Sequence, residues 1–132
     1  MQLTKQLAIF LENRPGMLAA VCEALAEQKI NVYALMTSDT IDHSVVRMVV
    51  SDTRKAMLLF EERGTLVVED EVILVEGGNK AGELAKIAKT LAQAKVNIEY
   101  CYCAASSGAK KGLLVLRVSN PQKALKALNM NM

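Results

Sequence analysis

The chain has 132 residues, of which 52% are hydrophobic, and its 16 basic and 14 acidic residues leave a net charge of +2. Because the basic residues are mixed with the acidic ones and form no block, the sequence disfavours a nucleic-acid-binding surface. No apolar stretch is long enough to span a membrane, and the run from Leu7 to Leu11 is too short for a secretory signal. We therefore expect no membrane partner and a cytoplasmic location.

The cysteines and the single histidine, His43, do not form a recognisable metal or redox motif. Cys101 and Cys103 lack the spacing of a redox pair or a zinc site, and one histidine does not make a metal site. We expect reduced thiols and no cofactor, with Cys22 in a helix core and Cys101 and Cys103 on one strand face.

The sequence nearly repeats itself at a spacing of 66 residues, from Asn13 to Asn79. The segment Asn13–Val32 aligns with Asn79–Ile98, and the aligned positions are identical at Asn13/Asn79, Gly16/Gly82, Leu18/Leu84, Ala19/Ala85, Leu25/Leu91, Ala26/Ala92, Lys29/Lys95 and Asn31/Asn97. Such self-similarity indicates two copies of one supersecondary unit. We expect two domains, 1–70 and 71–132, each only marginally stable alone, that pack together and dimerise.

The hydrophobic pattern of the first copy alternates between strand and helix periodicity. Arg14 is expected to cap the first helix and Pro15 to open it, and Thr53 is expected to cap the second. The expected elements are, in chain order, strand 7–11, a helix from Pro15 to Gln28, strand 30–37, strand 44–51, a helix from Thr53 to about Arg63 and strand 65–68. This βαββαβ order predicts an α+β, ferredoxin-like unit with two helices on one face of a four-stranded antiparallel sheet.

The second copy follows the same order but ends early. Glu69–Glu71 is expected to be a solvated linker, followed by strand 72–76, helix 82–94, strands 97–104 and 113–118 and helix 121–128. Asn129–Met132 is too short for a fourth strand, so we expect the linker strand or a partner chain to cover the open edge. Strands that are apolar on both faces, such as Leu113–Leu116, indicate that the face away from the helices is also buried.

The turn Asn13–Gly16 is the sharpest candidate for a binding site. A helix N-terminus is a receptor for a carboxylate, and the Asn13 carboxamide could hold the amino group of the same small zwitterion. Asn31 recurs as Asn97 at the start of a strand, where asparagine is disfavoured. Either these two residues bind a ligand, or both copies inherited a turn residue when the sequence was duplicated.

No catalytic set is visible, so we do not expect an enzyme. The serines have no matched histidine and acid, and there is no phosphate-binding loop. Gly77-Gly78 is interpreted as a flexible turn rather than as a phosphate site.

With Glu12–Leu18 followed by Ile30–Val32, in two copies, the chain resembles a stand-alone tandem ACT-domain protein. Its first copy resembles the serine-binding ACT domain of phosphoglycerate dehydrogenase. The resemblance implies that a small amino acid binds at an interface between ACT units and that the signal passes to a metabolic enzyme. The ligand-binding residues it implies are Asn13, Arg14, Pro15, Gly16, Met17, Leu18, Asn31 and Val32, and in the second copy Asn79, Gly82, Glu83, Leu84, Asn97 and Ile98.

Departures from the pattern leave the ligand open. Leu11 stands where that ACT domain has a histidine, and Ala81 stands where the first copy has Pro15. The alternatives are an ACT-based scaffold without a ligand, and an RNA-binding protein on a similar frame. The RNA-binding alternative is disfavoured because Ser44–Ser51 has no aromatic residue.

Overall fold

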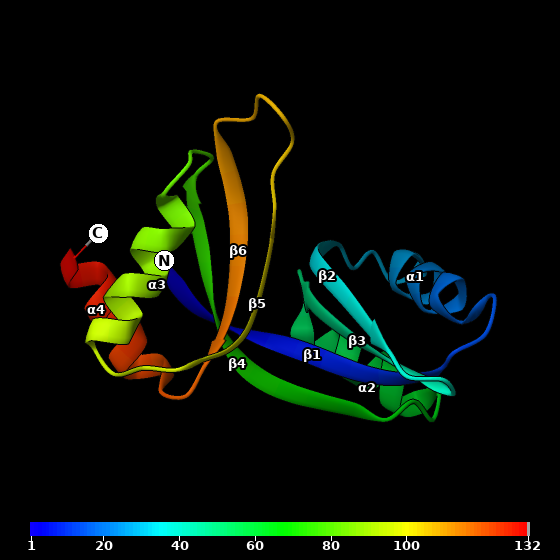
Figure 1. Cartoon of the computed structure of the whole chain (residues 1–132). Helices are drawn as coiled ribbons and strands as arrows, with labels where there is room; N and C mark the ends of the chain where they lie inside the picture. Colours follow the sequence, from blue (N-terminus) through cyan, green and yellow to red (C-terminus); the bar gives the residue numbers. More distant parts are fainter. Residues whose placement is uncertain (132) are drawn as a thin grey trace. The chain divides into compact units, whose positions relative to one another are not determined.

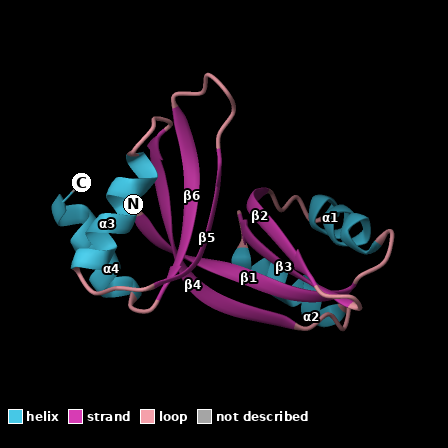
Figure 2. Cartoon of the chain, viewed as in Figure 1, coloured by secondary structure: helices cyan, strands magenta, loops and turns pink. Residues whose placement is uncertain are grey.

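The computed structural model describes residues 1–131, which form four helices and six strands (Figures 1 and 2). Within these residues no helix is both long enough and apolar enough to cross a membrane. The elements are β1 (Gln2–Glu12), α1 (Met17–Glu27), β2 (Val32–Asp39), β3 (His43–Val50), α2 (Thr53–Glu62), β4 (Val67–Gly78), α3 (Glu83–Gln93), β5 (Ile98–Ala104), β6 (Lys111–Val118) and α4 (Pro121–Asn131).

The chain divides into two compact units, which confirms the predicted fold of two ferredoxin-like copies. The first unit is Lys5–Asp70, and the second combines Met1–Thr4 with the chain from Glu71 onward. The strand order is β2-β3-β1-β4 in the first unit and β5-β6-β4-β1 in the second. Neighbouring strands are antiparallel, with Leu7 opposite Met48 in the first unit and Val75 opposite Leu114 in the second.

Strands β1 and β4 are longer than predicted because each contributes to both units. The first residues of β1 belong to the second unit, where Leu3 packs against the core. The first residues of β4 belong to the first unit, where Val67 packs against the core. The acidic run Glu69–Glu71 therefore connects the two units, as predicted, but it does so as part of strand β4 rather than as an irregular linker.

The predicted lack of a C-terminal fourth strand in the second unit is confirmed for residues 1–131, where α4 extends to Asn131. The chain's own residues Gln2–Thr4 take the place of that strand. The sequence pattern predicts a linker strand or a partner chain there, and the N-terminal strand occupies the place instead. The N-terminal segment was overlooked because its alternation, from Gln2 to Thr4, is too short to be recognised as part of a strand.

Each unit has its own hydrophobic core between its helices and its sheet. Leu25 and Phe60 anchor the helices of the first unit, and Leu91 and Leu128 those of the second. The helix-free faces are also buried in places, as the doubly apolar strands predicted. The buried residues on those faces include Gln6, Ala8 and Val49 in the first unit and Val72 and Val115 in the second.

The helix boundaries correct two predicted caps. Helix α1 begins after Gly16, whose φ of 88° is in the left-handed region, so Arg14 is not its cap and Pro15 is not its first residue. Gly82, with a φ of 94°, precedes α3 in the same way. Glycine reaches this conformation at little cost, and it lets the chain reverse before the helix starts. Helix α2 is capped by Asp52, one residue before Thr53, because the Asp52 carboxylate accepts from the Lys55 amide at 3.0 Å.

Candidate functional site

The turn between β1 and α1 is held in place by Asn13. Its Nδ2 atom donates to the Thr40 carbonyl at 3.0 Å, and its backbone amide donates to the Asp42 carbonyl at 2.9 Å. Beside it, the Arg14 Nε atom lies 2.8 Å from the Glu12 carboxylate. The carboxamide therefore fastens this turn to the loop between β2 and β3, a structural role that the sequence did not predict.

Asn79 repeats this arrangement in the second unit. Its Nδ2 atom donates to the carbonyls of Ser106 and Ala109, at 3.2 and 2.9 Å, and its amide donates to the Lys110 carbonyl at 3.0 Å. Both asparagines thus connect the start of a helix to the loop at the same end of the sheet. Within residues 1–131 their Oδ1 atoms accept no hydrogen bond, so each keeps one acceptor available.

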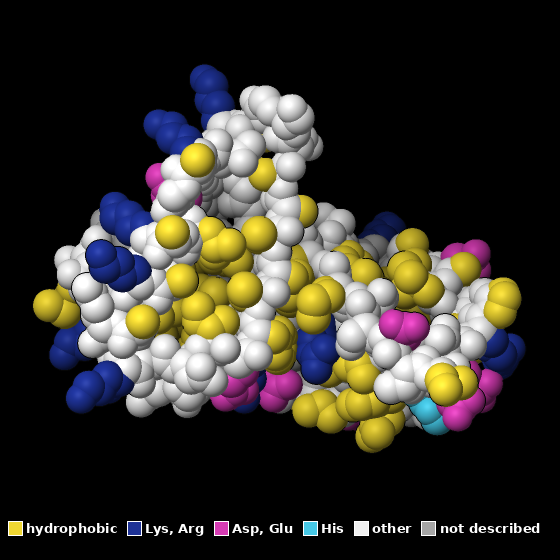
Figure 3. All heavy atoms as spheres, in the orientation of Figure 1, with side chains coloured by type: hydrophobic (Ala, Val, Ile, Leu, Met, Phe, Trp, Pro, Cys, Tyr) yellow, Lys and Arg dark blue, Asp and Glu magenta, His cyan; other side chains and the backbone are white. Residues whose placement is uncertain are grey.

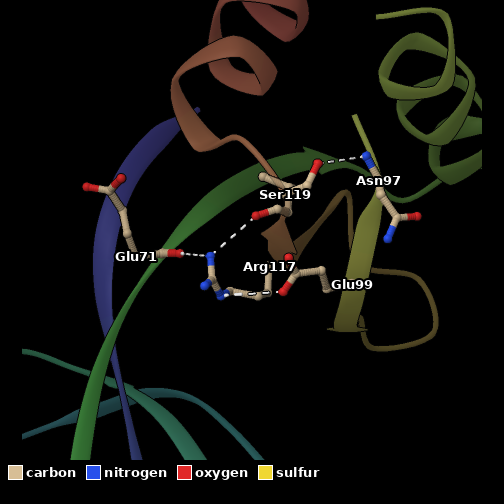
Figure 4. Close-up of polar contacts among 6 residues, drawn as sticks. Glu71, Asn97, Glu99, Arg117 and Ser119 are labelled. Carbon is tan, nitrogen blue, oxygen red and sulfur yellow. Dashed lines mark hydrogen bonds and ion pairs between the residues drawn. The ribbon is translucent and has the colours of Figure 1, made fainter. Parts of the chain in front are cut away.

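Asn31 and Asn97 also occupy equivalent positions. The Asn31 amide donates to the Ser51 hydroxyl at 2.9 Å, and the Ser51 amide donates to the Asn31 carbonyl at 2.9 Å. Asn97 and Ser119 form the same two bonds, at 3.1 and 3.0 Å. Figure 4 shows that the Asn97 carboxamide points away from Ser119. The backbone bonds explain how the chain enters each strand, but they leave both exposed carboxamides without a structural role.

Within one unit, the two asparagines lie at opposite ends of the sheet. In the first unit Glu12, next to Asn13, pairs with His43, whereas Val32, next to Asn31, pairs with Val50. These two pairs stand at the two ends of β3, which is eight residues long. At roughly 3.4 Å per residue the ends are about 24 Å apart. An amino acid therefore cannot touch both asparagines of one unit.

The Asn97 end of the second unit carries a cluster of charged side chains (Figure 4). The Arg117 Nη1 atom donates to the carbonyls of Glu71 and Val118, at 3.5 and 3.3 Å, and its Nε atom lies 3.9 Å from the Glu99 carboxylate. In the first unit, Val49 and Tyr33 occupy the positions of Arg117 and Glu99. The Asn97 end therefore has an ion pair where the Asn31 end has uncharged side chains, although their backbones match.

A pocket of about 320 Å³ opens in the second unit at the Asn79 end of the sheet. It lies between the start of α3 and the ends of β4, β5 and β6, in a region where hydrophobic side chains gather on the visible face (Figure 3). It brings together three of the predicted residues, Asn79, Glu83 and Leu84, whereas Gly82, Asn97 and Ile98 do not line it. The other lining residues are Val75, Gly77, Gly78, Lys80, Ile87, Cys103, Ala104, Ala105, Gly112, Leu113 and Leu114.

The pocket exists because small residues replace larger ones in the second copy. Leu11 belongs to the core of the first unit, and its counterpart is Gly77. Opposite them, Ser44 pairs with Leu11, and Gly112 pairs with Gly77. The interpretation of Gly77-Gly78 as a flexible turn is wrong, since both lie in β4 and pair with β6. A position-by-position comparison of the two copies could have found this site.

The first-copy residues of the predicted site occupy different surroundings. Met17 and Val32 pack against the first core, whereas Leu18 is exposed on α1. Pro15 and Gly16 form the turn before α1. Of these first-copy residues only Met17 and Val32 pack against the core, and the others are exposed.

The cysteine predictions hold in part. Cys101 and Cys103 pair with Leu116 and Leu114, which places both on one face of β5, as expected. Cys22 is exposed on α1, so its prediction as a core residue is wrong. The buried residues of α1 are Val21, Ala24 and Leu25, and Cys22 lies at the edge of the face that they form. Helical spacing alone does not show on which side of that edge a residue falls.

Comparison with known proteins identifies the family. The family model described as an ACT domain pair matches residues 1–132. The chain belongs to this family. No curated protein sequence matches the chain. Among solved structures, protein BT0572 from Bacteroides thetaiotaomicron is 35% identical with a TM-score of 0.91, over 97% of this chain and 88% of that one.

Two structures of kinase regulatory components share the fold at lower identity. The ligand-free regulatory subunit of aspartate kinase from Thermus thermophilus is 19% identical with a TM-score of 0.71, over 100% of this chain and 98% of that one. The regulatory subunit of aspartate kinase from Thermus flavus is 21% identical with a TM-score of 0.64, over 98% and 95%. At these identities the likeness establishes the ACT fold pair and nothing finer.

Proposed function

We propose that this chain is a non-catalytic regulatory protein that binds a small amino acid at interfaces between ACT units and modulates a partner enzyme. The observation that carries the proposal is the match of an ACT domain pair to the whole chain, together with the repeated asparagine turn in both units. Two similar structures are regulatory subunits of aspartate kinase, which supports a partner of the metabolic-enzyme class.

The positions of the asparagines support an interface between units. Because Asn13 and Asn31 belong to the same unit and stand at opposite ends of its sheet, both can contact a single ligand only when two copies of the chain supply them. A homodimer in the cytoplasm provides such an arrangement. The available Oδ1 atom of Asn13 then accepts from the ammonium group, and the exposed carboxamide of Asn31 from the second copy contacts the same zwitterion.

Thermal unfolding in the presence of each of the twenty amino acids, at millimolar concentration, tests this proposal. A ligand at 100 times its dissociation constant adds about 2.7 kcal/mol of stability, which raises the unfolding midpoint by about 10 °C for a chain of this size. We expect one amino acid, or a few related ones, to raise the midpoint, and Asn31→Ala or Asn97→Ala to reduce that rise. A chain whose midpoint moves with none of the twenty contradicts amino-acid binding.

The second candidate is an ACT-based scaffold that joins subunits and binds no ligand. The observation in its favour is that the Nδ2 atoms of Asn13 and Asn79 are already used to hold loops together, so their recurrence has a structural explanation. Under this alternative, Asn31→Ala and Asn97→Ala leave both the midpoint and the oligomeric state unchanged.

A further inference from the structure

We propose that the pocket beside Asn79 makes the second unit the selective one, and that it takes the apolar side chain of an amino acid. This inference rests on the proposed function and adds which unit selects the ligand and what class of side chain it selects.

The floor of the pocket is apolar. Val75, Ile87 and Leu114 are 2, 4 and 6% exposed, and all three belong to the second hydrophobic core. A hydrocarbon chain placed here removes apolar surface from water, whereas a hydroxyl or a carboxylate finds no side-chain partner on this floor. The volume of about 320 Å³ lies at the lower end of the range for small-ligand sites, which suits one amino acid.

The mouth of the pocket carries one positive and one negative side chain, Lys80 and Glu83. The Glu83 carboxylate lies over Gly78, since a Cβ atom on that glycine would stand 3.6 Å from Glu83 Oε1. Within the described chain, neither side chain forms a hydrogen bond or an ion pair. A zwitterion can therefore place its carboxylate by Lys80 and its ammonium group by Glu83 while its side chain enters the apolar floor.

The first unit lacks both features at the equivalent place. Glu12, the counterpart of Gly78, pairs with Arg14, the counterpart of Lys80, so that cation is already neutralised. Met17 replaces Glu83, and Leu11 replaces Gly77 and fills the core. The position that Leu11 fills in the first unit is open at Gly77 in the second, so we expect one selective pocket per chain.

Cys103 provides a direct test because it lines the pocket and is exposed. Cys101 is a matched control, since it lies on the same face of β5, is also exposed and does not line the pocket. The full chain is treated with iodoacetamide, with and without leucine or methionine, and alkylation of each cysteine is followed by mass spectrometry. At 100 times the dissociation constant about one site in a hundred is empty, so we expect Cys103 alkylation to slow by up to ~100-fold. Alkylation of Cys101 and Cys22 stays unchanged.

Filling the pocket gives the second arm of the test. Gly77→Leu installs the residue of the first unit, and we expect it to abolish both the leucine-dependent rise in midpoint and the protection of Cys103. Gly77→Ala is the control, because its Cβ atom would meet only the Val75 side chain at 3.8 Å, an ordinary contact, so binding is retained. Circular dichroism establishes that both variants are folded, and the Cys103 protection in the unmodified chain does not depend on either variant.

The outcomes separate this inference from the proposed function. Suppose that an amino acid raises the midpoint equally in the parent chain and in Gly77→Leu, and does not slow Cys103 alkylation. The pocket is then not the binding site, and the proposed function stands. If serine or aspartate protects Cys103 as well as leucine does, the apolar class is wrong. If no amino acid changes either readout, both the inference and the proposed function fall.

Discussion

The two units share a backbone and differ in how that backbone is filled. The residues that repeat between them hold the architecture: Asn13 and Asn79 fasten the loops, and Gly16 and Gly82 reverse the chain before a helix. The residues that differ change the interior: Gly77 stands in the second unit where Leu11 stands in the first. In this chain, identity between the copies marks the scaffold, and difference between them marks the place where a ligand can be selected.

The largest expected effect concerns what the units share. Leu25→Ala and Leu91→Ala remove equivalent core leucines, 1% and 0% exposed, and each should lower the free energy of unfolding by about 3 kcal/mol. Because β1 and β4 run through both units, we expect one urea transition, followed by circular dichroism, that both variants shift equally. Leu58→Ala, at a position 52% exposed, is the control and should cost under about 1 kcal/mol. Two separate transitions, with only one moved by each variant, would refute this coupling.

The next effect sharpens the difference between the filled and the hollow unit. Leu11→Ala should destabilise the chain by about 2 to 3 kcal/mol, because it leaves a cavity in the first core. Gly77→Ala at the equivalent place should stabilise it by about 0.5 kcal/mol, because alanine restricts the unfolded chain and meets no close neighbour. Chemical denaturation of both variants measures the contrast. Equal losses from the two would mean that the second unit closes its pocket in solution.

A smaller effect compares the loop contacts. Asn79→Ala removes two side-chain hydrogen bonds and should cost about 1 to 2 kcal/mol, whereas Asn13→Ala removes one and should cost about 1 kcal/mol. Hydrogen exchange should show faster exchange of the Ala109 region in the first variant and of the Asp42 region in the second. Uniform changes over the whole chain would argue that these bonds do not act locally.

The smallest effect concerns a feature that only the second unit has. Glu99→Gln removes the charge 3.9 Å from Arg117, and because both side chains are partly exposed we expect a loss of at most about 0.5 kcal/mol. The difference between the variant and the parent should disappear at 1 M salt, where the Debye length is about 3 Å. Thermal melts at low and high salt measure it, and a loss that persists at 1 M salt would show that the contact is not ionic.

Most of the fold could be predicted from the sequence because its signals are local. Helical spacing of Leu18, Val21 and Leu25 and the valine-rich strand before Ser51 set the order of elements, and the self-alignment set the number of copies. The helix start was misplaced because proline is a strong signal and the left-handed Gly16 depends on the direction of the whole turn. The passage of β4 through Glu69–Glu71 was missed because only pairing with β1, far away in sequence, makes a strand of an acidic run.

The candidate site was predicted less well than the fold. Asn79, Glu83 and Leu84 were named and do meet at one pocket, but Gly77, Cys103 and Gly112 were not. The pocket forms where small residues leave space, and a search for binding motifs looks for side chains that bind, not for positions where a large side chain is absent. The asparagine turn was recognised, while its hydrogen bonds to Thr40 and Ser106 depend on how closely two loops approach each other.

Because β1 and β4 each contribute to both units, cleavage of the chain would divide both sheets. Cleavage between Gly64 and Thr65, in the loop that separates α2 from β4, would give one fragment with β1, β2 and β3 and another with β4, β5 and β6. Neither fragment holds a four-stranded sheet, and each carries the strand segment that the other lacks. Two such pieces, expressed separately, are a natural pair for fragment complementation. The same reciprocity would let two identical halves, as separate chains, complete each other's sheets.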